Sequence, residues 1–290
     1  MHDFLASIGF RSIHTRKDMD RLIEWVLEKP DAVSIVSTGP ESNLAQAVRD
    51  VEGHAGVCVV GQIDEKGDII PEYYYPYLNS THVSSEGHIS CEKQADRDGF
   101  IGMLEDYRMG MALIFFVKNT AEVLKKFQDD PFHAYFHQVT LSALASDGVI
   151  LMPVEISEKV LEKAEKDKER RRELIKEAHE GDPAAMEAVA RSDIHEYHRV
   201  MQKLEESDMY TVVRTFFMPY GIDTERYYFM GTIQACRLIE NKYTQEKFYR
   251  MLIEVNDMQL MLAIHEADLL GVPEPGMRIK CHAWLTGEIR

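Results

Sequence analysis

The sequence predicts an α+β protein in three parts: a mixed α/β N-terminal domain, a helical connector and a small, OB-like C-terminal β-barrel. Residues 1–155 mix apolar patterns of helical period with patterns of strand period. Residues 156–208 carry charged side chains at helical spacing, and residues 209–290 hold five short strand-like runs, two of which are joined by a predicted turn at Asn256-Asp257. These three observations define the predicted domain boundaries.

The charge balance restricts the classes of partner. The 290 residues include 33 basic and 49 acidic side chains, which gives a net charge of −16. A field of that sign repels nucleic acids and anionic membranes. The four cysteines are widely spaced, and no apolar run reaches the ~18–20 residues of a membrane span. We therefore expect a cytoplasmic protein with no nucleic-acid or membrane partner.

Two helices are predicted in the N-terminal domain. Thr15 and Asp18 have the spacing of a capping box, and Pro30 follows the end of the helix that they open. Its apolar stripe consists of Met19, Leu22, Ile23, Val26 and Leu27. Asn119 and Glu122 predict the start of a second, shorter helix.

Strands are predicted around these helices. Residues 56–63 and 69–77 read as a hairpin. Residues 109–117 are apolar on both faces, which favours a central strand. Residues 139–154 read as a second hairpin that turns at Asp147-Gly148.

The connector has the composition of a solvated helix. Acidic and basic residues are equally frequent between Glu158 and Glu180, with ion-pair spacings such as Glu162–Lys166. The apolar stripe lapses over residues 167–172, so we expect the middle of this helix to project into solvent.

The final strand carries the most distinctive surface of the predicted barrel. Met277, Ile279, Cys281 and Leu285 alternate with polar residues and should face the barrel interior. The opposite face presents Arg278, Lys280, His282 and Trp284. Basic and aromatic residue types of this kind are those that bind single-stranded nucleic acid. However, residues 221–290 are slightly acidic, whereas a protein that binds single strands presents a positively charged groove. We interpret the face as an internal or protein-partner interface.

A second candidate site lies in the N-terminal domain. Asp98, Asp106 and Arg108 precede an apolar strand, and Tyr73 and Tyr75 alternate along another. A buried carboxylate cluster with an arginine and an aromatic wall could act on a small ligand. The alternative is a structural ion pair and packed tyrosines.

The sequence gives no metal or cofactor signature. P-loop, GxGxxG, GxSxG and HExxH motifs are absent. His133/His137 and His195/His198 are spaced for one helix face, but no third ligand accompanies either pair. We therefore predict neither a metal nor a cofactor, and no catalytic residue.

Four stretches together resemble a known family: "MHDFLASIGF", "DRDGFIGMLEDYRMGMALIFF", "FFMPYG" and "DLLGVPEPGMRIKCHAWLTG". The family consists of uncharacterised proteins of this length from Clostridia and related Gram-positive anaerobes, catalogued as a domain of unknown function. The resemblance implies a cytoplasmic protein of three successive parts. It supplies no reaction, ligand or catalytic residue.

Three functional hypotheses follow. The first is a non-catalytic binding or adaptor protein that contacts a protein partner through the barrel and the connector. The alternative is an enzyme that acts on a small ligand in the N-terminal domain. A weaker alternative is an oligonucleotide-binding barrel. The sequence does not indicate an oligomeric state.

Overall fold

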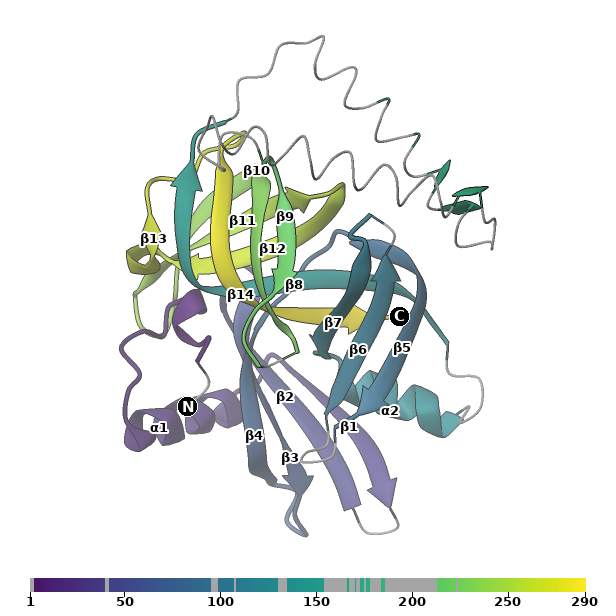
Figure 1. The fold of residues 1–290 in the computed structure, drawn as a ribbon. Helices are drawn as coiled ribbons and strands as arrows, with labels where there is room; N and C mark the ends of the chain where they lie inside the picture. Colours follow the sequence, from purple (N-terminus) through teal and green to yellow (C-terminus); the bar gives the residue numbers. More distant parts are fainter. Residues whose placement is uncertain are drawn as a thin grey trace.

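Two β-sheets dominate the part of the chain that the computed structural model describes (Figure 1). The described residues are 3–39, 42–94, 99–106, 108–129, 135–153, 213–222 and 224–290, with scattered positions between 166 and 185. Most of the predicted helical connector therefore lies outside the described residues. Within them, two α-helices accompany the sheets, α1 (Arg16–Glu28) and α2 (Thr120–Asp129). The predicted α+β class is wrong, because the described chain is mostly β.

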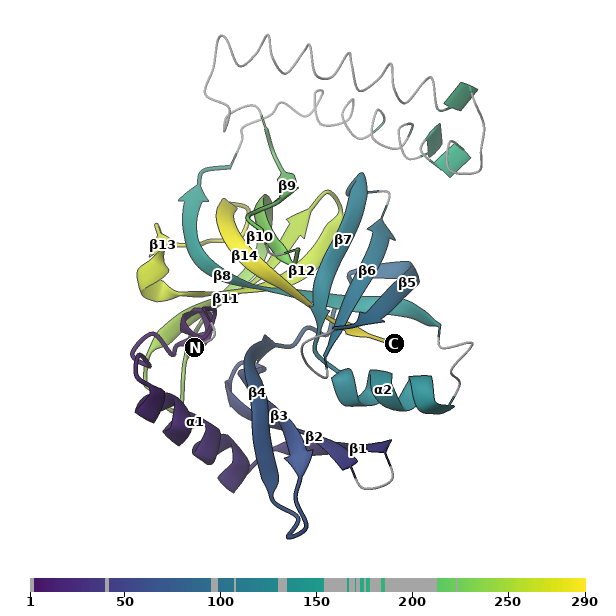
Figure 2. The same ribbon diagram turned by 60° about the horizontal axis from the view of Figure 1, so that its bottom comes forward.

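The first sheet is an antiparallel meander. Its strands, in spatial and sequence order, are β1 (Ala32–Gly39), β2 (Ser42–Glu52), β3 (Ala55–Ile63) and β4 (Ile69–Leu78). A short 3₁₀ helix, η1 (Ala6–Ile8), and α1 precede it. Figure 2 shows α1 and α2 on opposite sides of this sheet.

The second sheet takes strands from both sides of the predicted domain boundary at residue 155. Its strands are β5 (Ser85–Lys93), β6 (Phe100–Asp106), β7 (Met111–Val117), β8 (Phe136–Leu151), β9 (Phe216–Pro219), β10 (Arg226–Glu240), β11 (Lys247–Val255), β12 (Met258–His265), β13 (Leu269–Leu270) and β14 (Arg278–Ile289). A 3₁₀ turn, η2 (Glu266–Asp268), joins β12 to β13.

β8 and β14 form the centre of the second sheet. They pair antiparallel along the whole length of β14. From this pair, one circuit of strand pairings runs through β12, β11 and β10, and another runs through β5, β6 and β7. Figure 1 shows that the long strand β8 extends through both of these circuits of the second sheet. The prediction of a self-contained OB-like barrel in residues 209–290 is wrong, because the C-terminal strands need β8, from residues 136–151, to complete their pairing.

The predicted hairpin over residues 139–154 is also wrong. β8 continues without a turn through Asp147 and Gly148, which pair with β14. A Cβ at residue 148 would lie 2.8 Å from Ile264 Cδ1. Glycine here permits the close approach of a neighbouring strand, as glycine within a strand often does.

Most local predictions are confirmed. Thr15 and Asp18 form a reciprocal capping box at α1. β3 and β4 are a hairpin, and β7 lies between β6 and β14. The β11–β12 turn at Asn256-Asp257 has positive φ at both residues, as a tight hairpin turn requires.

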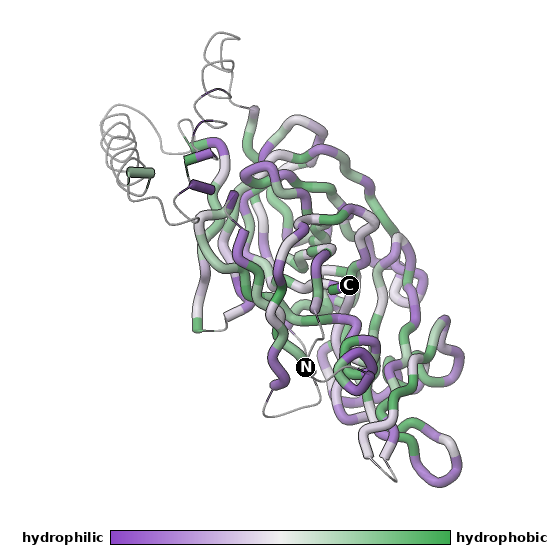
Figure 3. Tube along the Cα trace, turned by 90° about the vertical axis from the view of Figure 1, so that its right-hand side faces the viewer, coloured by the Kyte–Doolittle hydropathy of each residue, from purple (hydrophilic) through white to green (hydrophobic). Residues whose placement is uncertain are grey.

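Two hydrophobic cores result. One lies within the second sheet and includes Phe115, Met251 and Ile279. The other joins the first sheet, α1 and the N-terminal segment to the outer side of the second sheet, and includes Leu22, Val59 and Phe248. Figure 3 shows hydrophobic and hydrophilic positions interspersed along the chain. In the described ranges, no helix has the length and apolarity needed to cross a membrane.

Candidate interaction surface

Arg278, predicted to face outward, is an internal cation. Its side chain is buried, with 7% of the residue exposed. The guanidinium Nε and Nη2 donate to the carbonyl oxygen of Met152 at 3.1 and 3.0 Å, and Nη1 donates to that of Val213 at 2.9 Å. Arg278 thus joins the end of β8 to the chain that leads into β9.

Trp284 is internal as well. Its ring packs against Phe4 and Phe116 at centroid distances of 5.9 and 5.2 Å, and 7% of the residue is exposed. The N-terminal segment and β7 cover this part of the outer face of β14. The alternation of the final strand was read correctly for Ile279 and Cys281, which lie in the core of the second sheet.

His282 and Lys280 are the two predicted surface residues of β14 that are half-buried rather than buried. The imidazole of His282 stacks on the ring of Tyr228 at a centroid distance of 4.4 Å and contacts the tilted ring of Tyr220 at 4.3 Å. Its Nδ1 lies 2.9 Å from Asp147 Oδ1. A carboxylate only accepts hydrogen bonds, so Nδ1 carries the proton in this contact. The imidazole of this ring stack is therefore held by contacts with two tyrosine rings and by a hydrogen bond.

This stack belongs to a larger surface that we name the aromatic patch. The patch consists of Phe216, Met218, Tyr220, Tyr228 and His282. Tyr228 on β10 is directly opposite Met218 on β9 and His282 on β14, so one register places the three side chains on one face. Met218 is 48% exposed and Tyr220 is 50% exposed.

Sequence reasoning found His282 but missed the other members of the aromatic patch. The sequence predicts a strand over "FFMPYG", but not that its side chains share one surface with His282. A signal was present, because Pro219 in a short strand-like run indicates an edge strand. β9 is indeed at one end of the described second sheet and pairs with β10.

Asp106 and Arg108, predicted as part of a small-ligand site, hold the turn between β6 and β7. Asp106 accepts from Ser85 Oγ at 2.6 Å and from Arg108 Nε at 2.9 Å. Arg108 also donates to the carbonyl oxygens of Ser84 and Asp257 at 2.9 and 3.0 Å. Burial acts to raise the pKa of the Asp106 carboxyl, but the hydrogen bonds from Arg108 and Ser85 outweigh it and lower the pKa.

The structure does not unite the predicted ligand residues around one opening. Asp98 lies outside the described residues. Tyr75 is buried in the first sheet, where its hydroxyl donates to the Lys118 carbonyl oxygen at 2.6 Å and accepts from Gln46 Nε2 at 2.7 Å. Tyr73 is half-buried, with its ring 6.3 Å from that of Tyr75. These contacts share no residue with those described above for Asp106.

Lys118 is a buried cation that is not among the site residues predicted from the sequence. Its Nζ donates to the Leu78 carbonyl oxygen and lies 3.2 Å from Asn79 Oδ1 and 3.4 Å from Ser142 Oγ. All three partners are neutral. Burial lowers the pKa of Lys118 to about 8, against a weaker opposing effect of Glu288. The residue directly follows an apolar strand, which is the signal that could have indicated burial.

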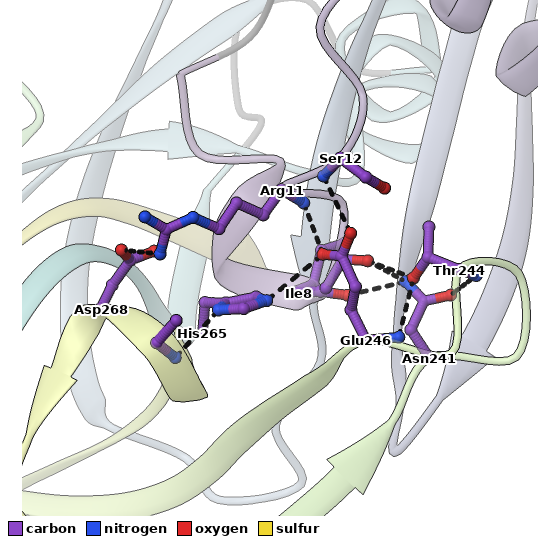
Figure 4. Close-up of polar contacts among 10 residues, drawn as sticks. Ile8, Arg11, Ser12, Asn241, Thr244, Glu246, His265 and Asp268 are labelled. Atoms are coloured by element: carbon purple, nitrogen blue, oxygen red, sulfur yellow. Dashed lines mark hydrogen bonds and ion pairs between the residues drawn. The ribbon is translucent and has the colours of Figure 1, made fainter.

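A second polar network attaches the N-terminal segment to the β10–β11 hairpin (Figure 4). Asn241 Nδ2 donates to the carbonyl oxygens of Ile8 and Gly9 at 2.9 and 3.1 Å. Glu246 accepts the backbone N–H groups of Arg11 and Ser12 at 2.7 and 2.8 Å. These contacts join residues more than 230 positions apart, so they were not visible in local sequence patterns.

Of the predicted histidine pairs, only His137 lies in the described chain, on β8. Across the described ranges, no group of three or more His, Cys, Asp or Glu side chains is arranged to hold a metal. A small pocket lies between β1, β2 and the start of α2. It is lined by Ala32, Ser34, Gln46, Val48, Asn119 and Glu122.

The comparison with protein families covers nearly the whole chain, from residue 5 to residue 287. The chain belongs to the family described as "Domain of unknown function, E. rectale Gene description (DUF3881)". The DUF3881 match begins just before η1 and ends within β14, so both sheets belong to one family unit. No curated protein and no solved structure matches this chain.

Proposed function

We propose that this DUF3881 protein is a non-catalytic binding protein that contacts a protein partner through the aromatic patch. The observation that carries the proposal is the half-exposed pair Met218 and Tyr220 beside the Tyr220–His282–Tyr228 stack. Contiguous exposed apolar surface marks interaction sites, and Tyr and Met are enriched in the centres of protein interfaces. The stacked rings lose little conformational entropy on binding.

The charge of the chain favours a basic partner. A second copy would bring another −16 charges toward the first, which opposes self-association through this surface. Exposed tyrosine faces accept lysine or arginine side chains through cation–π contacts. Asp147, which is 2.9 Å from His282 Nδ1 and mostly exposed, adds a carboxylate at the edge of the aromatic patch. We therefore expect a partner segment that carries both cationic and apolar side chains.

This proposal modifies the hypothesis drawn from the sequence. The partner surface keeps His282, has Lys280 beside it on β14, and replaces the buried Arg278 and Trp284 with residues of β9 and β10. A contribution of residues 156–208 and a cytoplasmic location remain part of the proposal. The enzyme alternative has less support, because Asp106, Arg108 and Tyr75 are engaged in internal contacts.

The proposal can be tested by affinity capture from native cytosol with quantitative mass spectrometry. The full chain is compared with Met218→Ala and Tyr220→Ala, two changes at exposed positions that should leave stability within about 0.5 kcal/mol. Leu270→Ala is the matched control, because Leu270 is 71% exposed and lies outside the aromatic patch, on β13.

We expect a basic protein to be retained by the parent and by Leu270→Ala, and lost with both patch variants. The purified partner should then bind the parent more weakly as salt rises, since the association is electrostatically assisted. Retention of the same proteins by all four chains would contradict the proposal.

A further inference from the structure

Two arginines lie directly opposite each other on the β10–β11 ribbon. Arg237 of β10 pairs in register with Arg250 of β11. Like charges at directly opposed positions destabilise an antiparallel pair. The arrangement is unexpected in a chain with 49 acidic residues, which supply carboxylate partners for Arg11, Arg226 and Arg290 elsewhere.

No carboxylate in the described part of the chain neutralises the pair. Within the described ranges, neither guanidinium forms an ion pair, and Arg250 Nε is buried without a hydrogen-bond partner. Glu52 is close enough to Arg237 to feel its charge, but its carboxylate is ion-paired with Lys242 at 2.6 Å. Burial, followed by the charge of Arg237, lowers the pKa of Arg250.

The surroundings strengthen interactions with an anion. Phe248 and Leu252 flank Arg250 along β11. Phe248 belongs to the core between the two sheets, and the partly buried Leu252 packs against that core. A cation beside buried apolar groups is less screened than one in water. Guanidinium groups present planar forks of donors that match the oxygens of phosphate.

We propose that Arg237 and Arg250 form a binding site for a phosphate group. A phosphate dianion would neutralise both cations and would relieve the repulsion between the two strands. The site is separate from the aromatic patch and does not depend on the proposed function. The phosphate could be free, or it could be a monoester carried by a larger molecule; the test distinguishes these sources.

The test is a calorimetric titration of the full chain with inorganic phosphate and with O-phosphoserine, at constant pH and ionic strength. Sulfate and chloride titrations measure non-specific anion binding. Arg237→Gln and Arg250→Gln each remove one guanidinium. Arg237→Lys keeps the positive charge but lacks the planar set of N–H donors of a guanidinium. Arg21→Gln removes the same charge from the exposed side of α1 and is the control.

We expect saturable phosphate binding that weakens by about tenfold or more in each glutamine variant, because each loses charge-assisted hydrogen bonds. Arg237→Lys should lie between parent and Arg237→Gln, and Arg21→Gln should match the parent. Tighter binding of phosphoserine indicates a monoester ligand, and tighter binding of inorganic phosphate indicates the free ion. If Arg250→Gln fails to fold, phosphate binding by the variants of the exposed Arg237 tests the proposal. Binding no tighter than that of chloride, or equal loss in Arg21→Gln, would overturn the proposal.

Discussion

The imidazole Nε2 of His265 lies 3.2 Å from Glu246 Oε2, so the end of β12 and the start of β11 meet at one carboxylate (Figure 4). His265 Nδ1 accepts the backbone N–H of Ala267 at 3.0 Å, which leaves Nε2 as the ring nitrogen nearest to Glu246. The same carboxylate accepts two backbone N–H groups from the N-terminal segment. Glu246 therefore joins three parts of the chain.

Glu246→Ala should destabilise the fold by about 1–3 kcal/mol, because it leaves two backbone donors without their acceptor. Burial acts to raise the pKa of Glu246, but the hydrogen bonds from Ser12 and Arg11 outweigh it and lower the pKa. A lowered pKa means that the carboxylate stabilises the fold above the unfolded pKa of 4.5 and loses this effect as pH falls through the folded value. Urea denaturation at pH 7 and in acid measures both effects.

The control for this change is Glu240→Ala, which removes an exposed carboxylate from the same hairpin. We expect its effect at pH 7 to stay within about 0.5 kcal/mol. A cost for Glu246→Ala that does not shrink in acid would mean that the carboxylate charge is not the cause.

Lys118→Met should gain stability relative to the parent at pH 7. The ammonium of Lys118 is desolvated among neutral acceptors, and its pKa is lowered from 10.5 to about 8. Below pH 8 the lysine is protonated in both the folded and the unfolded state. Between pH 8 and pH 10.5 the unfolded chain binds more protons than the folded chain, so the free energy of unfolding of the parent rises with pH. The advantage of Lys118→Met should therefore shrink by roughly 3 kcal/mol across this interval.

Denaturation curves of the two chains between pH 7 and pH 10 test this prediction, with the exposed Lys125→Met as control. Groups other than Lys118 titrate in all chains and cancel in the comparison. A stability difference independent of pH would show that Lys118 is not deprotonated in this range.

Local sequence patterns predicted the local elements well. The capping box of α1 and the Asn256-Asp257 turn depend on residues within a few positions of one another, and both are present. The continuous strand β8 was not predicted, because Asp147-Gly148 also has the composition of a turn. Pairing with β14, more than 130 residues away, determines the outcome, and tertiary contacts of that range leave no local signal.

The candidate surface was predicted only in part, because burial also depends on contacts between distant parts of the sequence. Alternation assigned Arg278 and Trp284 to the outer face of β14, and they do lie there. Their burial depends on Met152, Val213 and Phe4, which approach from distant parts of the sequence. The prediction that His282 belongs to a surface is correct because no distant segment buries the outer face of β14 at this residue.

Ile279→Ala should cost roughly 2–5 kcal/mol, because it removes a fully buried side chain from the core of the second sheet. Lys280→Ala, at the next and half-buried position, should cost less than about 0.5 kcal/mol. Urea denaturation of the two variants against the parent compares them directly. A larger loss for Lys280→Ala would indicate that this lysine, rather than Arg278, fixes the strand to its surroundings.

The chain should not bind single-stranded nucleic acid more tightly than the non-specific range of ~10⁻⁴–10⁻⁶ M at physiological salt. The net charge of −16 opposes association, and Trp284, the one indole of the final strand, is packed against Phe4 and Phe116 rather than open to a base. Fluorescence anisotropy with a labelled oligonucleotide measures the affinity.

Trp284→Ala is a poor probe here, because loss of a buried indole costs roughly 3–5 kcal/mol by itself. His282→Ala and Tyr220→Ala test base stacking at the exposed part of this face instead. Submicromolar binding that these two changes abolish would show that the aromatic patch contacts nucleic acid, and the protein-partner proposal would then be wrong.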